Sequence, residues 1–238
     1  MIINSVVFSL GEPKDNLYIQ MFLLSYWSLL KHSVFNPKAD QYILTCDKET
    51  AEYIQKTFPL IQQIKYLIVP KPKNCYDGMK LKYVLPFVYD VGKNPVLYID
   101  VDVFAFRPFR LWCPEDSIVA HPEGSITDSN YCGDMDFKGY GSHGYTAGFF
   151  GYSWGQRVKG VFASIINDIE NIPKKYYTLD QPYFNKYLKY VQVIPLSSTL
   201  SGNGHGNLDN CMFINCCGEP GDGAFHYNKM LQLYLKFH

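Results

Sequence analysis

Residues Val96 to Phe104 read Val-Leu-Tyr-Ile-Asp-Val-Asp-Val-Phe, an apolar run interrupted by two aspartates one residue apart. In an ideal strand, residues two positions apart point to the same side, so the carboxylates of Asp100 and Asp102 are predicted to face one ligand. Two such carboxylates can share one hard divalent cation, or one of them can bind the sugar part of a ligand. A strand end with solvated acids is the alternative, but an unpaired carboxylate inside an apolar run is costly.

Strand and helix patterns alternate on the N-terminal side of this segment. Apolar or β-branched runs predict strands at 2–8, 42–45, 66–69 and 95–104, and helical spacing of apolar residues predicts helices at 15–32, 47–54 and 79–89. Strands that alternate with helices are typical of a parallel sheet covered on both faces. Beyond residue 116 the pattern is less regular, with helices expected at 156–171, 180–190 and after 229. Because no Pro/Gly/Ser linker divides the chain, we expect one α/β domain over residues 1–238.

The composition fits a globular domain. Hydrophobic residues make up 47% of the 238 residues and charged residues 18%, which allows a large core and argues against disorder. The 22 Lys and Arg residues balance the 22 Asp and Glu residues, and this lack of a basic surplus argues against a nucleic-acid partner. Aromatic residues make up 16%, which suits a core and also a surface that stacks on sugars or bases.

Cysteine usage and the N-terminal residues favour the cytoplasm. Seven cysteines cannot all pair, Cys216 and Cys217 are adjacent, and no Cys-x-x-Cys or zinc spacing occurs. Residues 1–8 lack the basic region and cleavage site of a signal peptide, and every apolar run is shorter than the roughly 20 residues of a membrane span. We therefore expect a soluble, cytoplasmic protein with reduced cysteines and no membrane span.

The aspartate pair resembles the Asp-x-Asp signature of GT-A fold glycosyltransferases, especially the glycogenin and lipopolysaccharide galactosyltransferase-like families. Four further segments resemble family markers and occur in the same order: Gly-Met-Lys-Leu-Lys at 78–82, Tyr-Thr-Ala-Gly-Phe-Phe at 145–150, Leu-Asp-Gln-Pro-Tyr-Phe-Asn at 179–185 and Phe-His-Tyr-Asn-Lys at 225–229. The resemblance implies a GT-A fold with a mostly parallel central sheet flanked by helices. It also implies a Rossmann-like, nucleotide-sugar-binding half at about 1–104, and an acceptor-side half with a C-terminal closing segment at about 105–238.

The resemblance also implies an activity. The protein would move a sugar from a nucleotide-sugar donor, UDP-linked, to a glycan or glycoside acceptor, with retention of configuration. Mn²⁺, or Mg²⁺, would be held by Asp100, Asp102 and His226, and Lys229 would meet the diphosphate. Two departures concern this site: Asn228 precedes Lys229 where the family has a glycine in the loop, and Thr146 stands where asparagine is commoner.

The remaining site residues follow from the same resemblance. Asp180 and Gln181 are expected at the hydroxyls or the anomeric face of the donor sugar, as the catalytic pair, although an Asp that begins a helix is often simply an N-cap. Lys80 is expected to reach the donor, and Lys82, about 200° away around the helix, is expected to lie on a solvated face. The other expected donor contacts are Ser9, Leu10, Tyr18, Val101, Ala147, Gly148 and Asn228, with Asp47 a weaker candidate.

Two other functions remain open at this point. A nucleotidyltransferase that forms nucleotide-sugars would carry a basic, glycine-rich phosphate loop after its first strand, but residues 9–13 are acidic and short. A non-catalytic carbohydrate-binding module would not need the ordered set of markers. The glycine-rich stretches 124–144, 201–207 and 218–223 are candidates for mobile or acceptor-side loops, with plain surface turns as the alternative.

Overall fold

A seven-stranded sheet forms the centre of the molecule in the computed structural model, which describes residues 3, 5–11, 16–32, 41–59, 61, 64–88, 95–125, 143–171, 176, 178–196, 201–203, 211–216 and 223–237. The strand order is β3-β2-β1-β4-β7-β6-β8. Its strands are β1 (Ser5–Ser9), β2 (Gln41–Cys46), β3 (Ile64–Ile68), β4 (Val96–Ile99), β6 (Ser117–Ser125), β7 (His143–Tyr152) and β8 (Gln192–Pro195). The first four run parallel, β7 is antiparallel to both of its neighbours, and β8 is parallel to β6.

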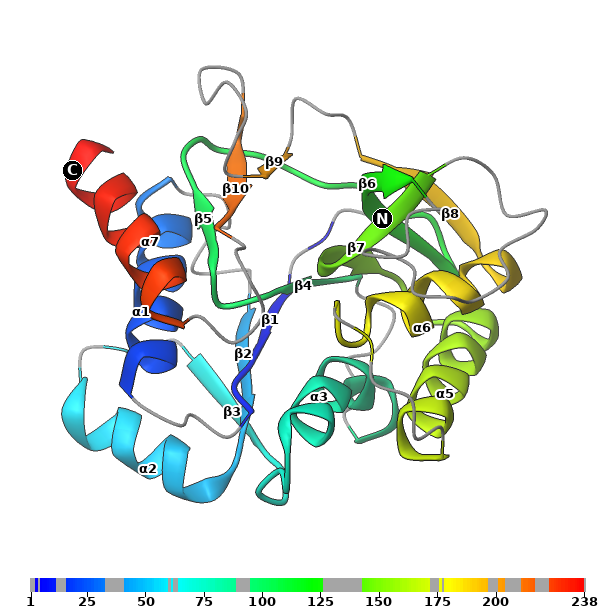
Figure 1. The fold of residues 1–238 in the computed structure, drawn as a ribbon, viewed down its shortest axis with the longest axis horizontal. Coiled ribbons are helices and arrows are strands. Elements are labelled where there is room, and N and C mark those ends of the chain that lie inside the picture. The colour runs from blue at the N-terminus through cyan, green and yellow to red at the C-terminus, as the bar shows by residue number, and fades with distance from the viewer. Residues whose placement is uncertain are drawn as a thin grey trace.

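Helices cover both faces of this sheet (Figure 1). On one side lie α1 (Asn16–Lys31), α2 (Lys48–Thr57) and α7 (Gly223–Phe237), and on the other α3 (Cys75–Val88), α5 (Gln156–Asn171), α6 (Gln181–Tyr187) and the 3₁₀ turn η1 (Leu188–Tyr190). This is the predicted class, an α/β fold with a mostly parallel central sheet flanked by helices.

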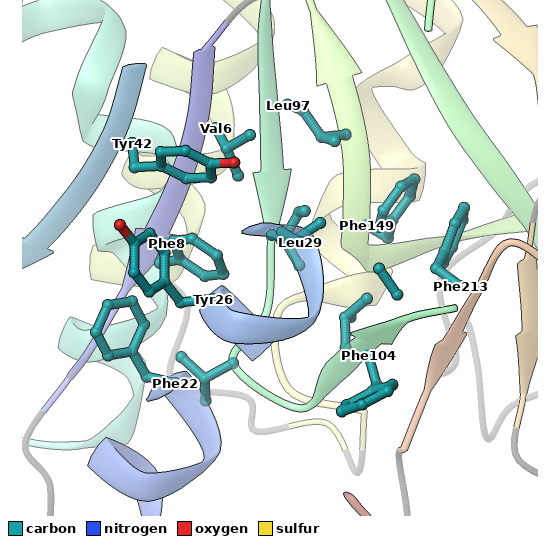
Figure 2. Packing of buried hydrophobic residues seen from close by; sticks show 14 of the residues in the cluster. Val6, Phe8, Phe22, Tyr26, Leu29, Tyr42, Leu97, Phe104, Phe149 and Phe213 are labelled. Carbon is teal, nitrogen blue, oxygen red and sulfur yellow. The ribbon is translucent and has the colours of Figure 1, made fainter. Parts of the chain in front are cut away.

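Alternation along the strands divides the core into two layers. Val6 and Phe8 pack with the first helix group, whereas Val7 between them packs with the second, as the pleat of a strand requires. In the first layer, side chains of α1 such as Phe22 and Leu29 point at these strand residues (Figure 2). In the second, the Tyr83 ring of α3 stacks on Phe150 of β7 and thereby fixes α3 against the sheet.

A second, three-stranded sheet lies beside the end of β4. It consists of β5 (Val103–Ala105), β10 (Phe213–Asn215) and β9 (Ser201–Asn203), in the order β5-β10-β9. Phe213 of β10 stacks on Phe149 of β7, with ring centroids 3.7 Å apart, so the small sheet is packed against the large one. This contact brings a C-terminal strand next to the aspartates that follow β4.

The prediction of one strand at 95–104 is wrong. The chain leaves the large sheet after Ile99 and enters the small sheet at Val103, and a turn between them is closed by the Val103 N–H, which donates to the Asp100 carbonyl at 3.2 Å. Asp100 and Asp102 therefore meet through this turn and not through the pleat of one strand. The sequence did not reveal this turn, because the strands on both sides of it are buried and therefore read as one continuous apolar run.

Other boundaries differ less. The last helix begins at Gly223 and not after 229, and the third helix begins at Cys75. Residues 126–142, 204–207 and 217–222, which hold most of the glycine-rich stretches, lie outside the described residues. None of the helices in the described part of the chain is long and apolar enough to cross a membrane. The division into a donor half and an acceptor half stays a prediction.

Candidate active site

The candidate site lies where β1 and β4 end. Ligands of open α/β sheets bind outside the carboxyl ends of the strands, and the Asp100 turn occupies this edge. The Tyr98 hydroxyl at the end of β4 donates to Asp100 Oδ1, and it lies 3.0 Å from the Oγ of Ser9 at the end of β1. The Asp100 N–H donates to the Gly148 carbonyl at 2.8 Å. The side chain of Asp100 is thus held by Tyr98 of β4, and its backbone by Gly148 of β7.

Lys82 is the buried cation of this site. Its ammonium Nζ lies 3.5 Å from Asp100 Oδ1 and 3.2 Å from Asp180 Oδ2, and it donates to the Ala147 carbonyl at 3.2 Å. The side chain also lies over the Tyr98 ring, 5.1 Å from its centroid. Although burial acts to lower it, the charges of Asp100 and Asp180 hold the pKa of Lys82 above its usual value. Lys82 therefore carries a positive charge between two aspartates.

The expectation that Lys82 faces solvent is wrong, since the residue is only 4% exposed. Lys80, which was expected to reach the donor, forms ion pairs at 2.9 Å with both Asp77 and Glu170. The two lysines do diverge around α3 as helical geometry requires, but the face that meets the sheet is the one that carries Lys82.

Asp180 is held by side chains of α3. The Tyr83 hydroxyl donates to its Oδ2, and Lys82 Nζ donates to its Oδ1 at 3.3 Å. Burial and the charge of Asp180 raise the pKa of Tyr83, so its hydroxyl stays a donor. Asp180 precedes α6, but its side chain makes no capping hydrogen bond, so the simple N-cap interpretation is wrong. The preceding Leu179 has φ of 57°, a left-handed conformation that is unfavourable for a leucine.

Gln181 connects α6 to β7. Its Oε1 accepts from the Ala147 N–H at 3.3 Å, while its buried Nε2 has no hydrogen-bond partner among the described residues. Asn185, one turn later, bonds both the N–H and the carbonyl of Tyr145, at 2.8 and 2.9 Å. Helix α6 is therefore fixed on β7 while one donor of Gln181 remains available to a ligand.

Asp102 contacts the C-terminal helix. Its Oδ2 lies 3.2 Å from Nδ1 of His226, and both side chains are largely buried. One turn further along α7, the buried Nζ of Lys229 has no hydrogen-bond partner within the described part of the chain and lies over the Phe225 ring, 5.7 Å from its centroid. Asn228 is exposed on the same helix. Asp102 and His226, two of the three residues expected to hold the cation, are thus in contact.

Gly148 leaves space beside Asp100. A Cβ on this residue would lie 2.7 Å from Asp100 Oδ2 and 3.3 Å from Asn215 Nδ2, too close for any side chain to be accommodated without movement. Asn215 is the last residue of β10, and its buried Oδ1 lacks a hydrogen-bond partner among the described residues. The sequence indicated Asn215 only in that it is the one amide in the apolar run 211–216.

Glu123 is another residue near the aspartate pair that the sequence did not reveal. Burial raises the pKa of this β6 carboxyl, the Thr146 hydroxyl bonded to it acts in the opposite direction, and the charge of Asp102 raises it further. It therefore lies on the β6–β7 side of the aspartate pair. No spacing in the sequence connects residue 123 to residue 102.

Three residues that were expected to contact the donor have structural roles in this fold. Leu10 is 2% exposed and belongs to the core, and Tyr18 packs against the same layer. Asp47 caps α2 by accepting from the Thr50 N–H at 3.0 Å. Although burial acts to raise it, the Thr50 hydrogen bonds hold the pKa of Asp47 below its usual value. Val101 lies in the Asp100 turn and is 9% exposed.

The donor types suit a hard divalent cation, since the Asp100 carboxylate borders a space that only glycine leaves open and the Asp102 carboxylate lies close enough to interact with it electrostatically. Within the described residues, however, no group of three or more His, Cys, Asp and Glu side chains is arranged to hold a metal ion. The carboxylates of Asp100 and Asp102 therefore have the chemistry that such an ion requires.

Comparisons with known proteins identify the fold. No protein-family model matches the chain, and no curated protein matches its sequence. Among solved structures, the galactosyltransferase LgtC in complex with donor and acceptor sugar analogues matches with a TM-score of 0.61 and 12% identity, over 98% of this chain and 95% of LgtC. An active-site mutant of LgtC matches with a TM-score of 0.61 and 11% identity, over 96% and 95% of the two chains.

The apo form of the glycosyltransferase GlyE from Streptococcus pneumoniae TIGR4 matches with a TM-score of 0.60 and 14% identity, over 99% of this chain. The match spans 64% of the GlyE chain, so this protein corresponds to part of its length. At these identities the likeness concerns the fold. The chain has the α/β fold of these glycosyltransferases, and the predicted resemblance to the GT-A type is confirmed.

Proposed function

We propose that the protein is a glycosyltransferase that moves a sugar from a nucleotide-sugar donor to a carbohydrate acceptor. The observation that carries this proposal is the buried Lys82–Asp180 pair, which also contacts the partly exposed Asp100 at the carboxyl ends of the parallel strands. Buried charges are expensive, and a fold retains them where a ligand uses them. The solved structures of the same fold are glycosyltransferases, and one of them holds donor and acceptor sugar analogues.

On the donor side of the reaction, the diphosphate of the nucleotide-sugar would bind together with a divalent cation, Mn²⁺ or Mg²⁺. Asp100 and Asp102 would be its carboxylate ligands, and a cation there would neutralise charge on the departing diphosphate. Lys229 supports the same assignment, because a buried ammonium group without a hydrogen-bond partner among the described residues suits an anionic ligand. We infer UDP as the nucleotide from the resemblance, with Ser9 at the end of β1 lining the nucleoside pocket.

Asp180 and Gln181 would contact the donor sugar. Both oxygens of Asp180 already accept hydrogen bonds, from Tyr83 and Lys82, which suits a group that orients a sugar hydroxyl better than one that attacks carbon. The buried Nε2 of Gln181, which has no hydrogen-bond partner among the described residues, can donate to the sugar. The LgtC mutant structure shows that this relative also has a glutamine in its active site. Because both oxygens of Asp180 already accept hydrogen bonds, we propose retention by attack of the acceptor on the face that the diphosphate leaves.

A binding titration with matched variants tests the proposal. We expect UDP to bind the wild-type protein more tightly with Mn²⁺ than without it, and Asp102→Asn to lose this dependence because one ligand carboxylate is gone. Glu52→Gln is the control, since Glu52 is 65% exposed and pairs only with Lys48 among the described residues. Incubation with UDP-, GDP- and dTDP-sugars, with product analysis, identifies the donor. UDP binding that is equal in wild type and Asp102→Asn would show that the nucleotide site lies elsewhere.

A further inference from the structure

We propose that Tyr76 and Leu179 are positioning residues: together they set the turn at 178–181 and thereby place Asp180 and Gln181 for contact with the donor sugar. This inference rests on the proposed function, which supplies the sugar and its two protein contacts. Neither residue was expected in this role from the sequence.

The turn at 178–181 has a backbone conformation that suits glycine. The Gln181 N–H donates to the Thr178 carbonyl at 3.1 Å and closes the turn. Its second residue, Leu179, has φ of 57°, and its third residue, Asp180, has φ of −88° and ψ of −11°. Such angles are typical of a type II′ turn, whose second position is usually glycine, asparagine or aspartate. A leucine at this φ is strained, and the strain persists only where surrounding contacts hold the chain in place.

Helix α3 holds this turn through two of its tyrosines. The hydroxyl of Tyr76, near the start of the helix, accepts a hydrogen bond from the Tyr176 N–H. The hydroxyl of Tyr83 donates to the Asp180 carboxylate. Because Tyr76 and Tyr83 are two helical turns apart, they lie on one face of the helix, about 10 Å from each other. One face of α3 therefore contacts both ends of the segment 176–180.

The groups that contact the turn are themselves fixed. The Tyr176 ring meets the Tyr183 ring of α6 edge to face, with centroids 5.2 Å apart, and the Tyr176 carbonyl accepts from the Leu179 N–H at 3.1 Å. The first turn of α3 lies directly against the chain that follows β1, since a Cβ on Gly11 would lie 3.1 Å from the Cα of Gly78. The hydrogen bond to Tyr176 thus comes from a part of α3 that has little room to move.

The φ of Leu179 decides where the next two side chains lie. It sets the direction of the chain into α6, so that Gln181 Oε1 accepts from the Ala147 N–H at 3.3 Å and the Asp180 carboxylate meets α3. Because a change of φ rotates the chain that follows, a negative φ at Leu179 would turn these groups away from β7 and α3. Packing of the half-buried Leu179 side chain is the competing explanation, and it predicts the opposite response to substitution.

Two substitutions at Leu179 separate backbone conformation from packing. Leu179→Gly removes the side chain but accepts a positive φ, whereas Leu179→Ile keeps the apolar volume and, as a β-branched residue, rejects this φ. The Ala147 amide, observed by NMR in protein labelled with ¹⁵N-alanine, reports the position of Gln181 without any ligand. We expect this amide to be as in wild type in Leu179→Gly, and its hydrogen exchange to be about tenfold faster or more in Leu179→Ile because the bond to Gln181 is lost.

Tyr76→Phe tests the contact from α3. It keeps the ring and removes the hydroxyl that accepts from the Tyr176 N–H, so we expect the Ala147 amide to exchange about tenfold faster or more, as in Leu179→Ile. Tyr190→Phe is the matched control, because Tyr190 is 60% exposed in η1, and it should leave the Ala147 amide unchanged. Urea unfolding checks that each variant is folded.

Calorimetric titration in the presence of Mn²⁺ then separates the sugar from the nucleotide. The affinity for UDP should be as in wild type in Leu179→Ile and Tyr76→Phe, because the proposed contacts of Asp180 and Gln181 are with the sugar. The affinity for UDP-glucose or UDP-galactose, relative to that for UDP, should fall by about tenfold. General damage to the fold would weaken the binding of all three ligands alike.

Two results would overturn the assignment. Faster exchange of the Ala147 amide in Leu179→Gly than in Leu179→Ile would make Leu179 a packing residue, and an unchanged Ala147 amide in Tyr76→Phe would remove Tyr76 from the role. A displaced Ala147 amide in Leu179→Ile and Tyr76→Phe, in a protein that shows no preference for a UDP-sugar over UDP or binds neither, would support the positioning role and count against the proposed function alone.

Discussion

The ammonium group of Lys82 lies 3.2 Å from the carboxylate of Asp180, in a pair whose side chains are each 5% exposed. The two residues are 98 positions apart in the sequence and come from α3 and the start of α6. Removing one partner of such a pair leaves the other charge buried without compensation, which costs more than the intact pair contributes. The pair therefore ties the stability of the fold to the geometry of the site.

Lys82→Met is expected to lower the free energy of unfolding by about 3–5 kcal/mol, because Asp180 and Asp100 lose their buried cation. Lys80→Met should cost less than about 1 kcal/mol, since its partners Asp77 and Glu170 are 28% and 51% exposed and remain hydrated without it. Urea unfolding at pH 7 measures both. In the double variant Lys82→Met with Asp180→Asn the losses should be less than additive. Equal losses at the two lysines would show that the buried pair contributes no more than the exposed one.

The fold was predictable because its signals are local. The alternation of strands and helices up to Phe104 follows from short apolar runs and helical spacing, and the structure bears it out. Asp100 and Asp102 were also named from the sequence, because two carboxylates in an apolar run have a plain chemical meaning, and Gly148 was named through the resemblance to a family marker strand. The structure brings these three residues together at one edge of the sheet.

The rest could not be predicted because it depends on tertiary contacts. Helical geometry separates Lys80 from Lys82, but only packing against β7 decides which of them is buried. The turn at Asp100 arises because β5 leaves the large sheet to pair with β10, more than 100 residues later. Asn215 lies beside Asp100 through the same pairing, and no one-dimensional spacing records it.

Gly148→Ala is expected to disturb the cation site. The added methyl group would lie 2.7 Å from Asp100 Oδ2, so the carboxylate must shift, at a cost of about 1–3 kcal/mol, and the affinity for Mn²⁺ with UDP should fall. Gly160→Ala is the matched control: a Cβ there meets nothing within 4 Å, and an alanine in helix α5 should raise the free energy of unfolding by about 0.5–1 kcal/mol. Calorimetric titration measures the affinity and urea unfolding the stability. Wild-type affinity in Gly148→Ala would show that the space beside Asp100 is not used.

His121 is expected to make stability depend on pH. Burial lowers the pKa of this β6 imidazole below its usual value, so the folded protein keeps it neutral where the unfolded chain begins to bind a proton. As the pH falls below about 6.5 the unfolded state is therefore favoured, and the stability contributed by neutral His121 is lost.

The comparison of wild type with His121→Gln isolates this effect. The free energy of unfolding of wild type minus that of the variant should be smaller at pH 5 than at pH 8. The other titrating groups, including Glu123, are common to both proteins. A difference that stays constant over this range would mean that the His121 imidazole titrates alike in both states.

Substitution of Lys229 distinguishes a structural from a functional role, because the two roles predict opposite effects on stability. Its Nζ is buried without a hydrogen-bond partner in the described part of the chain, so the charge opposes folding in the absence of a ligand. Lys229→Met keeps most of the side-chain volume and removes the charge. We expect the free energy of unfolding of the ligand-free variant to equal or exceed that of wild type, while its affinity for UDP falls by about 1.5–3 kcal/mol, the value of a hydrogen bond to a charged group.

Uridine should bind both proteins equally, because it lacks the diphosphate that Lys229 would contact. Lys236→Met, at an exposed lysine in the last turn of α7, controls for the loss of one positive charge and should leave both quantities unchanged. Opposite signs for stability and affinity cannot come from general damage to α7, which would lower both. A variant that is less stable but binds UDP with wild-type affinity would make Lys229 a structural residue and would leave the diphosphate without its proposed cationic contact.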